Sequence, residues 1–208
     1  MALKTKLSIL VAIATLAAAD AFGQSAGCAI PSVVVERIDG TVEIDESLPS
    51  SKLTRPEYGK DSIVMGRTDA PLRIAAEMRR RGDPCLEPGT VIIRAGYVGR
   101  VVRIAAEAAA DACLKNEILA HELGHVADDD AALDLAAKRL PGELIERLKA
   151  ISPENAETES IAIARKSIAE FKKELAVERD LAEKRRDTKE ESIRMDGVCG
   201  GAARRMFR

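Results

Sequence analysis

The segment at residues 116–130 reads NEILAHELGHVADDD, and the rest of the chain is best interpreted outward from it. His121, Glu122 and His125 form the pattern H-E-x-x-H. On a helix, side chains four residues apart lie on one face, so the two imidazoles are placed to bind one zinc ion. Glu122 is then placed as a general base for a water that zinc makes more acidic. The segment therefore predicts a helix that carries a zinc site.

A catalytic zinc site needs a third protein ligand. The chain has only two histidines, so we expect a carboxylate in preference to a cysteine or a tyrosine. Glu178 lies within the apolar stripe of a helix predicted to begin near Ser152 and to end near residue 186, and a charge on a packed face is costly unless it is paired or bound to metal. Glu178 is the predicted ligand, and Glu174, Asp128 and Asp187 remain alternatives.

The N-terminal residues 1–23 are predicted to be a secretory signal peptide. Lys4 and Lys6 precede an apolar run at residues 7–19, which is too short to span a membrane. We therefore expect a periplasmic or secreted protein without stable membrane insertion after cleavage. Lipidation of Cys28 is the alternative, but Ser25 stands where a lipobox has leucine, so we favour an unanchored protein.

The four cysteines all follow the predicted signal peptide, and an oxidising compartment favours their pairing. Three connectivities exist for four cysteines. We favour Cys28–Cys85 and Cys113–Cys199. The second bond would connect the start of the histidine helix to the C-terminal segment.

Composition and pattern predict an α+β fold in one domain at residues 24–208. A net charge of −2 gives no indication of a nucleic-acid partner. Residues 24–104 form the strand-containing half, a small antiparallel or mixed sheet, with a hairpin of 32–38 and 41–44 across Asp39-Gly40 and a short helix at 72–81. Whether the start of this half is an inhibitory pro-segment stays open.

Residues 105–199 are predicted to be the helical half, and 200–208 a flexible tail. We expect a break near Asp111 and a helix end at Pro141-Gly142. After the long helix, the capping-box pattern at Asp187-Thr188 predicts a new short helix that ends near Gly197.

The H-E-x-x-H residues resemble the motif of the zincin metallopeptidases. The resemblance implies a zincin-like fold in which His121 and His125 are zinc ligands and Glu122 is the base. It also implies that the strand at 101–104 is the edge strand of the sheet, along which an extended peptide lies. A third glutamate from a later helix is typical of the gluzincin branch, although no N-E-x-x-x-D pattern follows here. The chain departs from the metzincin branch, because Asp128 and Ala131 replace that branch's glycine and histidine. Residues 90–199 are also similar to small secreted bacterial zinc peptidase domains of unassigned function.

The sequence thus predicts an exported zinc-dependent peptidase that acts on a peptide or protein substrate. Tyr97 is considered as a donor to the oxyanion. The alternative is an exported domain without catalysis, which either binds zinc or uses the long helix at 155–186 to bind a partner.

Overall fold

The computed structural model describes residues 31–54, 63–79, 89–151 and 156–207. The predicted signal peptide and the Cys28–Cys85 pair lie outside these residues. In chain order the elements are β1 (Ser32–Arg37), β2 (Val42–Asp45), α1 (Ser50–Leu53), β3 (Gly66–Asp69), β4 (Leu72–Arg79), β5 (Thr90–Tyr97), β6 (Arg100–Ile104), α2 (Ala106–Ala109), α3 (Ala112–Leu148), α4 (Ala156–Arg186) and α5 (Lys189–Met206).

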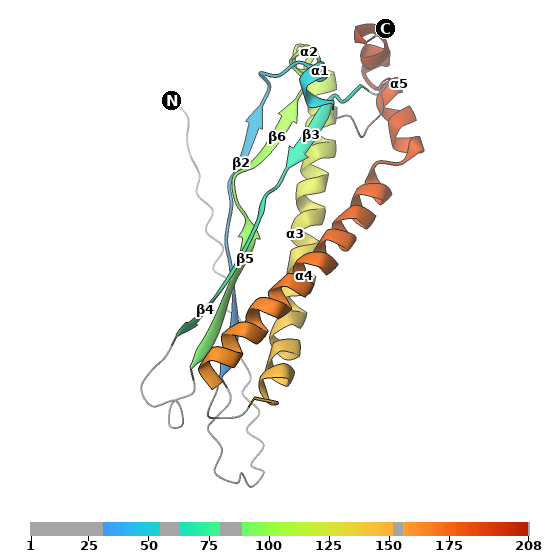
Figure 1. Cartoon of the computed structure of the whole chain (residues 1–208). Coiled ribbons are helices and arrows are strands. Elements are labelled where there is room, and N and C mark those ends of the chain that lie inside the picture. Colours follow the sequence, from blue (N-terminus) through green and yellow to red (C-terminus); the bar gives the residue numbers. More distant parts are fainter. Residues whose placement is uncertain (1–30, 55–62, 80–88, 152–155, 208) are drawn as a thin grey trace.

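The strands form two mixed three-stranded sheets, in the orders β1-β5-β4 and β2-β6-β3. The chain passes from one sheet to the other three times, between β1 and β2, β3 and β4, and β5 and β6. The two sheets therefore lie end to end, and α3 runs along both of them (Figure 1). The α+β class and the mixed sheet are confirmed.

The predicted hairpin of β1 and β2 is wrong. β1 pairs in parallel with β5, and β2 pairs in parallel with β6. The chain continues forward past Asp39-Gly40, and a side chain at Gly40 would collide with the main-chain carbonyl of Tyr97. Gly40 therefore permits a close approach of two backbones and does not form a hairpin turn.

The predicted helix at 72–81 is also wrong, because residues 72–79 form strand β4. Its burial alternates at every second residue, as a strand with one packed face requires. Leu72, Ile74 and Met78 pack against the core, whereas Arg73 and Arg79 are exposed. The alternation of inward apolar and outward residues therefore outweighs the helix propensity of alanine and arginine, and the segment forms a strand.

The predicted edge strand at 101–104 falls in β6, which lies in the middle of its sheet. Parallel β2 occupies one side of β6 and antiparallel β3 the other. The edge strand nearest the histidine segment of α3 is therefore β3.

The break near Asp111 is confirmed, since its side chain accepts hydrogen bonds from the backbone N–H groups of Cys113 and Leu114 at the start of α3. The predicted stop at Pro141-Gly142 is wrong, because α3 continues through Pro141 to Leu148. Leu144 and Leu148 are buried in the core, so packing of the last turns outweighs the lost backbone hydrogen bond.

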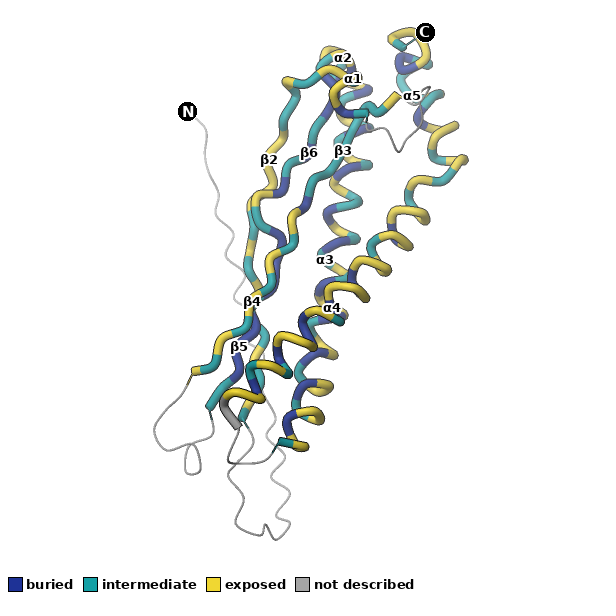
Figure 2. Tube along the Cα trace, viewed as in Figure 1, coloured by how far each residue is buried: buried dark blue, intermediate teal, exposed yellow. Residues whose placement is uncertain are grey.

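Buried residues recur every three or four positions along the length of α3, and so lie on one side of the helix (Figure 2). One core cluster joins β4, β5, α3 and α4, and a second joins β6, the start of α3 and α5.

No helix in the described part of the chain is long and apolar enough to cross a membrane.

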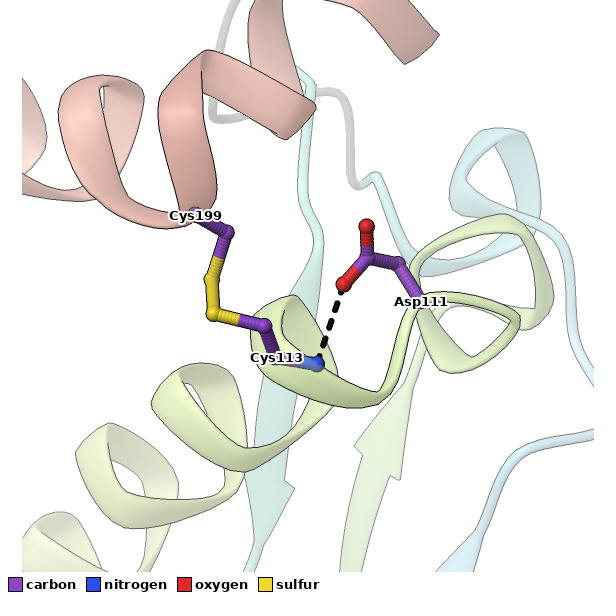
Figure 3. A group of neighbouring side chains, drawn as sticks. All are labelled: Asp111, Cys113 and Cys199. Atoms are coloured by element: carbon purple, nitrogen blue, oxygen red, sulfur yellow. Dashed lines mark hydrogen bonds between the residues drawn. A yellow bond between two sulfur atoms is a disulfide. The ribbon is translucent and has the colours of Figure 1, made fainter.

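The first helical stretch of α5 ends at a kink over residues 198–201, where the backbone leaves helical geometry, close to the end predicted near Gly197. Helix then resumes up to Met206, in contrast to the predicted flexible tail. Ala202 and Ala203 are buried in the second core cluster. The predicted Cys113–Cys199 disulfide is present and fastens this segment to the first turn of α3 (Figure 3). Cys199, Gly200 and Gly201 all have positive φ, so the segment turns sharply after the disulfide before it resumes as helix.

Candidate metal centre

The two histidines lie on α3 with their rings close together. Their ring centroids are 4.9 Å apart, and the Nε2 atoms of His121 and His125 are separated by 3.2 Å. Both side chains are mostly buried. The predicted helix and its shared face for the two imidazoles are therefore present.

Asp187 completes a group of three with the histidines. Its Oδ1 atom lies 3.0 Å from Nε2 of His121 and 3.1 Å from Nε2 of His125. Asp187 follows the last residue of α4, and the next residue, Thr188, caps α5 by accepting a hydrogen bond from the backbone N–H of Glu191. The junction between α4 and α5 thus brings a carboxylate to the histidine face of α3.

The pKa values of His121 and Asp187 are shifted by their contacts with one another. The hydrogen bond to Asp187 raises the pKa of His121, although burial acts in the opposite direction. Burial acts to raise the pKa of Asp187, but hydrogen bonds to His121 and His125 outweigh it and hold that pKa well below its usual range. Asp187 is therefore an ionised carboxylate, as metal binding requires.

The three donor atoms fit a tetrahedral zinc ion. Their mutual separations are 3.0, 3.1 and 3.2 Å. Ligands held about 2.0–2.1 Å from a zinc ion at tetrahedral angles lie roughly 3.3 Å apart. Two facing imidazole nitrogens and one carboxylate oxygen are a donor set that zinc prefers, and three protein ligands leave a fourth position for water.

Glu122 is buried beside this group, at 5% exposure. Thr68 on β3 donates a hydrogen bond to its Oε2 atom at 2.8 Å. A Cβ at Gly66 would lie 2.5 Å from its Oε1 atom, so glycine leaves room for the carboxylate against the strand. Burial raises the pKa of Glu122, while the Thr68 hydrogen bond partly opposes the shift.

A further layer orients His121. Its Nδ1 atom lies 3.3 Å from Oε1 of Glu191, which also accepts a hydrogen bond from Arg194 at 2.8 Å. Arg194 reaches back to Glu117 on α3, also at 2.8 Å. A carboxylate on the outer nitrogen of a metal-binding histidine fixes its tautomer and ring orientation.

The predicted third ligand, Glu178, is not among the residues around the histidines. It is exposed on α4, and the neighbouring Arg179 faces α3 instead, where it forms a two-point ion pair with Asp129. Glu174 is also exposed and pairs with Arg139. Of the four carboxylates considered, the structure brings Asp187 to the histidines, so Asp187 replaces Glu178 as the candidate ligand.

The structure also places Asp128, an alternative ligand, and Tyr97, the considered oxyanion donor. Asp128 lies near the group, but its Oδ2 atom accepts a hydrogen bond from Arg186 at 2.8 Å. Tyr97 is fully buried between Arg100 and Arg179 and does not line the cavity, so it is not placed to hold an oxyanion. Burial raises its pKa to about 12.

A cavity of about 400 Å³ opens over the group, between β3, α3 and the α4–α5 junction. Met65, Ile118 and Met195 give it an apolar wall. His121, Glu122, His125 and Asp187 line the same cavity, so a ligand bound there can reach all four side chains.

The sequence did not predict Thr68, Gly66, Glu191 or Arg194 as part of the site. The capping-box pattern around residue 188 was the only signal that included any of them, and it places Glu191 in the first turn of α5. Gly66 and Thr68 belong to β3. The position of this strand against α3 depends on long-range packing, which the local sequence does not reveal.

Comparison with known proteins gives no relative. No family model matches the chain, and neither a curated protein nor a solved structure matches it.

Proposed function

We propose that this chain is an exported zinc-dependent peptidase. The observation that carries the proposal is the convergence of His121, His125 and Asp187 within hydrogen-bond distance of one another, beside the buried carboxylate of Glu122 and in one cavity. When bound, zinc would supply Lewis-acid chemistry, which acidifies a water and polarises a carbonyl.

Glu122 is suited to move the proton. Thr68 occupies its Oε2 atom, and its Oε1 atom has no hydrogen-bond partner among the described residues. Burial raises the pKa of Glu122, which makes its carboxylate a better proton acceptor than an exposed glutamate. Oε1 therefore accepts the proton of the attacking water and returns it to the leaving amine.

Strand β3 supports a peptide substrate. It is one of the two edge strands of its sheet in the described part of the chain, and residues 66–68 line the cavity. An extended peptide that pairs with an open strand edge gains main-chain hydrogen bonds. Such a peptide would pass beside Glu122 and the candidate ligands. Export is supported by the N-terminal pattern and agrees with the Cys113–Cys199 disulfide.

Metal content of the oxidised protein tests the site. We expect about one zinc per chain in the parent by elemental analysis, and a large loss in His125→Ala and in Asp187→Ala, because a site with three protein ligands depends on each of them. Glu178→Ala is the matched control and should retain its zinc. Loss of zinc in Glu178→Ala but not in Asp187→Ala would restore the ligand predicted from the sequence.

Glu122→Gln tests catalysis separately from metal binding. We expect this variant to keep its zinc and to lose at least about a hundredfold in turnover of a peptide library, since general-base catalysis contributes that much. A parent that binds zinc but cleaves no peptide would instead support the non-catalytic zinc-binding domain. A parent that binds no zinc at neutral pH would contradict the proposal.

A further inference from the structure

Arg186 connects the two helices that supply the candidate ligands. It is the last residue of α4, and its Nε atom donates a hydrogen bond to Oδ2 of Asp128 on α3 at 2.8 Å. Asp128 lies one turn beyond Gly124 and three residues beyond His125. The contact therefore joins the end of α4 to the histidine face of α3.

Gly124 makes room for this contact. A Cβ at Gly124 would collide with the guanidinium of Arg186 and would lie 3.0 Å from its Nε atom. The guanidinium thus rests against the backbone of α3 at Gly124, which lies between His121 and His125 in the sequence. Glycine inside a helix costs about 1 kcal/mol relative to alanine, so its presence here needs a compensating role. By comparison, a Cβ placed on Gly142 in the same helix would have nothing within 4 Å, which makes Gly142 a matched site without such a contact.

Asp187 occupies the helix junction next to this contact. It follows Arg186 directly and lies where α4 has ended and α5 has not begun. Among the described residues, the hydrogen bonds of its carboxylate are those to His121 and His125. An ionised ligand at a helix junction must be held before metal arrives, or binding has to supply the ordering free energy.

We propose that Gly124, Asp128 and Arg186, here called the Arg186 bridge, are positioning residues that set Asp187 against the two histidines. The inference rests on the proposed zinc site. It also assigns Asp128 a role other than ligand, because its carboxylate is engaged by Arg186. The bridge holds the candidate ligands of α3 close to Asp187 at the end of α4. Asp128 and Arg186, which form its contact, are 58 residues apart in the sequence.

Paired glycine substitutions give the first test. Zinc affinity and the free energy of unfolding without metal are measured for the parent, Gly124→Ala and Gly142→Ala. We expect Gly124→Ala to weaken zinc binding by about tenfold or more, as loss of outer-layer partners does, while Gly142→Ala binds as the parent does. Neither variant should be less stable without metal, since alanine favours the helix and the displaced group is a flexible side chain.

The ion pair gives the second test. Arg186→Met and Asp128→Asn should each weaken zinc binding, and the double variant should be no weaker than the worse single variant, because both remove one interaction. Arg139→Met is the control, since Arg139 pairs with Glu174 across the same two helices away from the histidines. It should leave zinc affinity unchanged.

The outcomes separate the two proposals. Zinc in the parent with unchanged affinity in Gly124→Ala, or an equal loss in Arg139→Met, would overturn the Arg186 bridge and leave the metal site standing. Absence of zinc from the parent would refute the metal site, and the bridge with it. Weaker zinc binding in Gly124→Ala without loss of stability is the result that a purely structural role does not produce.

Discussion

His121 lies between two carboxylates, and both act to raise its pKa. Its Nε2 atom faces Asp187 at 3.0 Å and its Nδ1 atom faces Glu191 at 3.3 Å. Both neighbours favour the charged imidazolium, and the Asp187 hydrogen bond is the larger contribution to the raised pKa of His121. At the proposed zinc site, a proton and a zinc ion would therefore compete for the Nε2 atom of His121.

This competition predicts opposite pH dependences with and without metal. A raised folded-state pKa means that the His121–Asp187 pair stabilises the metal-free protein fully below the unfolded pKa of about 6.5, and that this stabilisation is lost as pH rises through the folded pKa. Zinc affinity should increase over the same pH interval, since zinc needs the neutral imidazole. Denaturant unfolding and zinc titration between about pH 6 and 8 measure the two trends.

Asp187→Asn is the reference for the metal-free measurement. The variant lacks the carboxylate that raises the pKa of His121. The difference between the parent and the variant in unfolding free energy should therefore shrink as pH rises. A difference that stays constant with pH would contradict the assigned cause of the shift.

At the level of elements, the junction of α4 and α5 is the part of the fold that completes the site. α4 ends at Arg186, Asp187 lies between the helices, and Thr188 begins α5 as its N-cap. The cap also fixes the first turn of α5, which carries Glu191. A single cap thus affects both a candidate ligand and the partner of His121.

Removing this cap should affect zinc binding more than removing another. Thr188→Ala is expected to cost about 1 kcal/mol in unfolding free energy and to weaken zinc binding. Asp111→Ala removes the N-cap of α3, whose side chain accepts two hydrogen bonds of 3.0 Å, but this residue does not contact the histidines. It should cost a similar amount of stability and leave zinc affinity near that of the parent. Equal zinc affinities in the two variants would argue against the role of the junction.

On the scale of the whole molecule, α3 and the disulfide connect parts that are distant in sequence. α3 contacts both sheets and both later helices. The Cys113–Cys199 bond spans a sequence separation of 86 residues, so it closes a loop that contains nearly all of α3 and all of α4. The three candidate ligands and Glu122 all lie within this loop.

The disulfide should therefore contribute strongly to stability. The chain-entropy relation gives about 4.6 kcal/mol for a loop of this length. Replacing both cysteines in Cys113→Ser/Cys199→Ser should lower the denaturant unfolding free energy by that order, and zinc affinity should fall as α5 loses its attachment to α3. A loss below about 1 kcal/mol would mean that packing of Ala202 and Ala203 already holds the segment in place.

Local patterns sufficed for several features. The H-E-x-x-H spacing fixes the relation of His121 and His125, because four residues make about one helical turn. Asp111 caps a helix through its own side chain, and the α+β order follows from the change in composition near residue 105. The Cys113–Cys199 bond could be favoured because the two cysteines flank the helical half.

The tertiary structure alone decided the third candidate ligand and the strand pairings. Spacing on α4 suggested that Glu178 continues the stripe after Leu175, yet Arg179 takes the inward position and pairs with Asp129. Residues three and four positions after Leu175 both lie near its face of the helix. The spacing on α4 alone therefore cannot tell whether Glu178 or Arg179 points inward. Which carboxylate reaches the histidines depends on where α4 ends and α5 turns back. That Asp187 lies there, and that β3 lies at an edge of its sheet in the described part of the chain, are consequences of long-range packing that no short segment encodes.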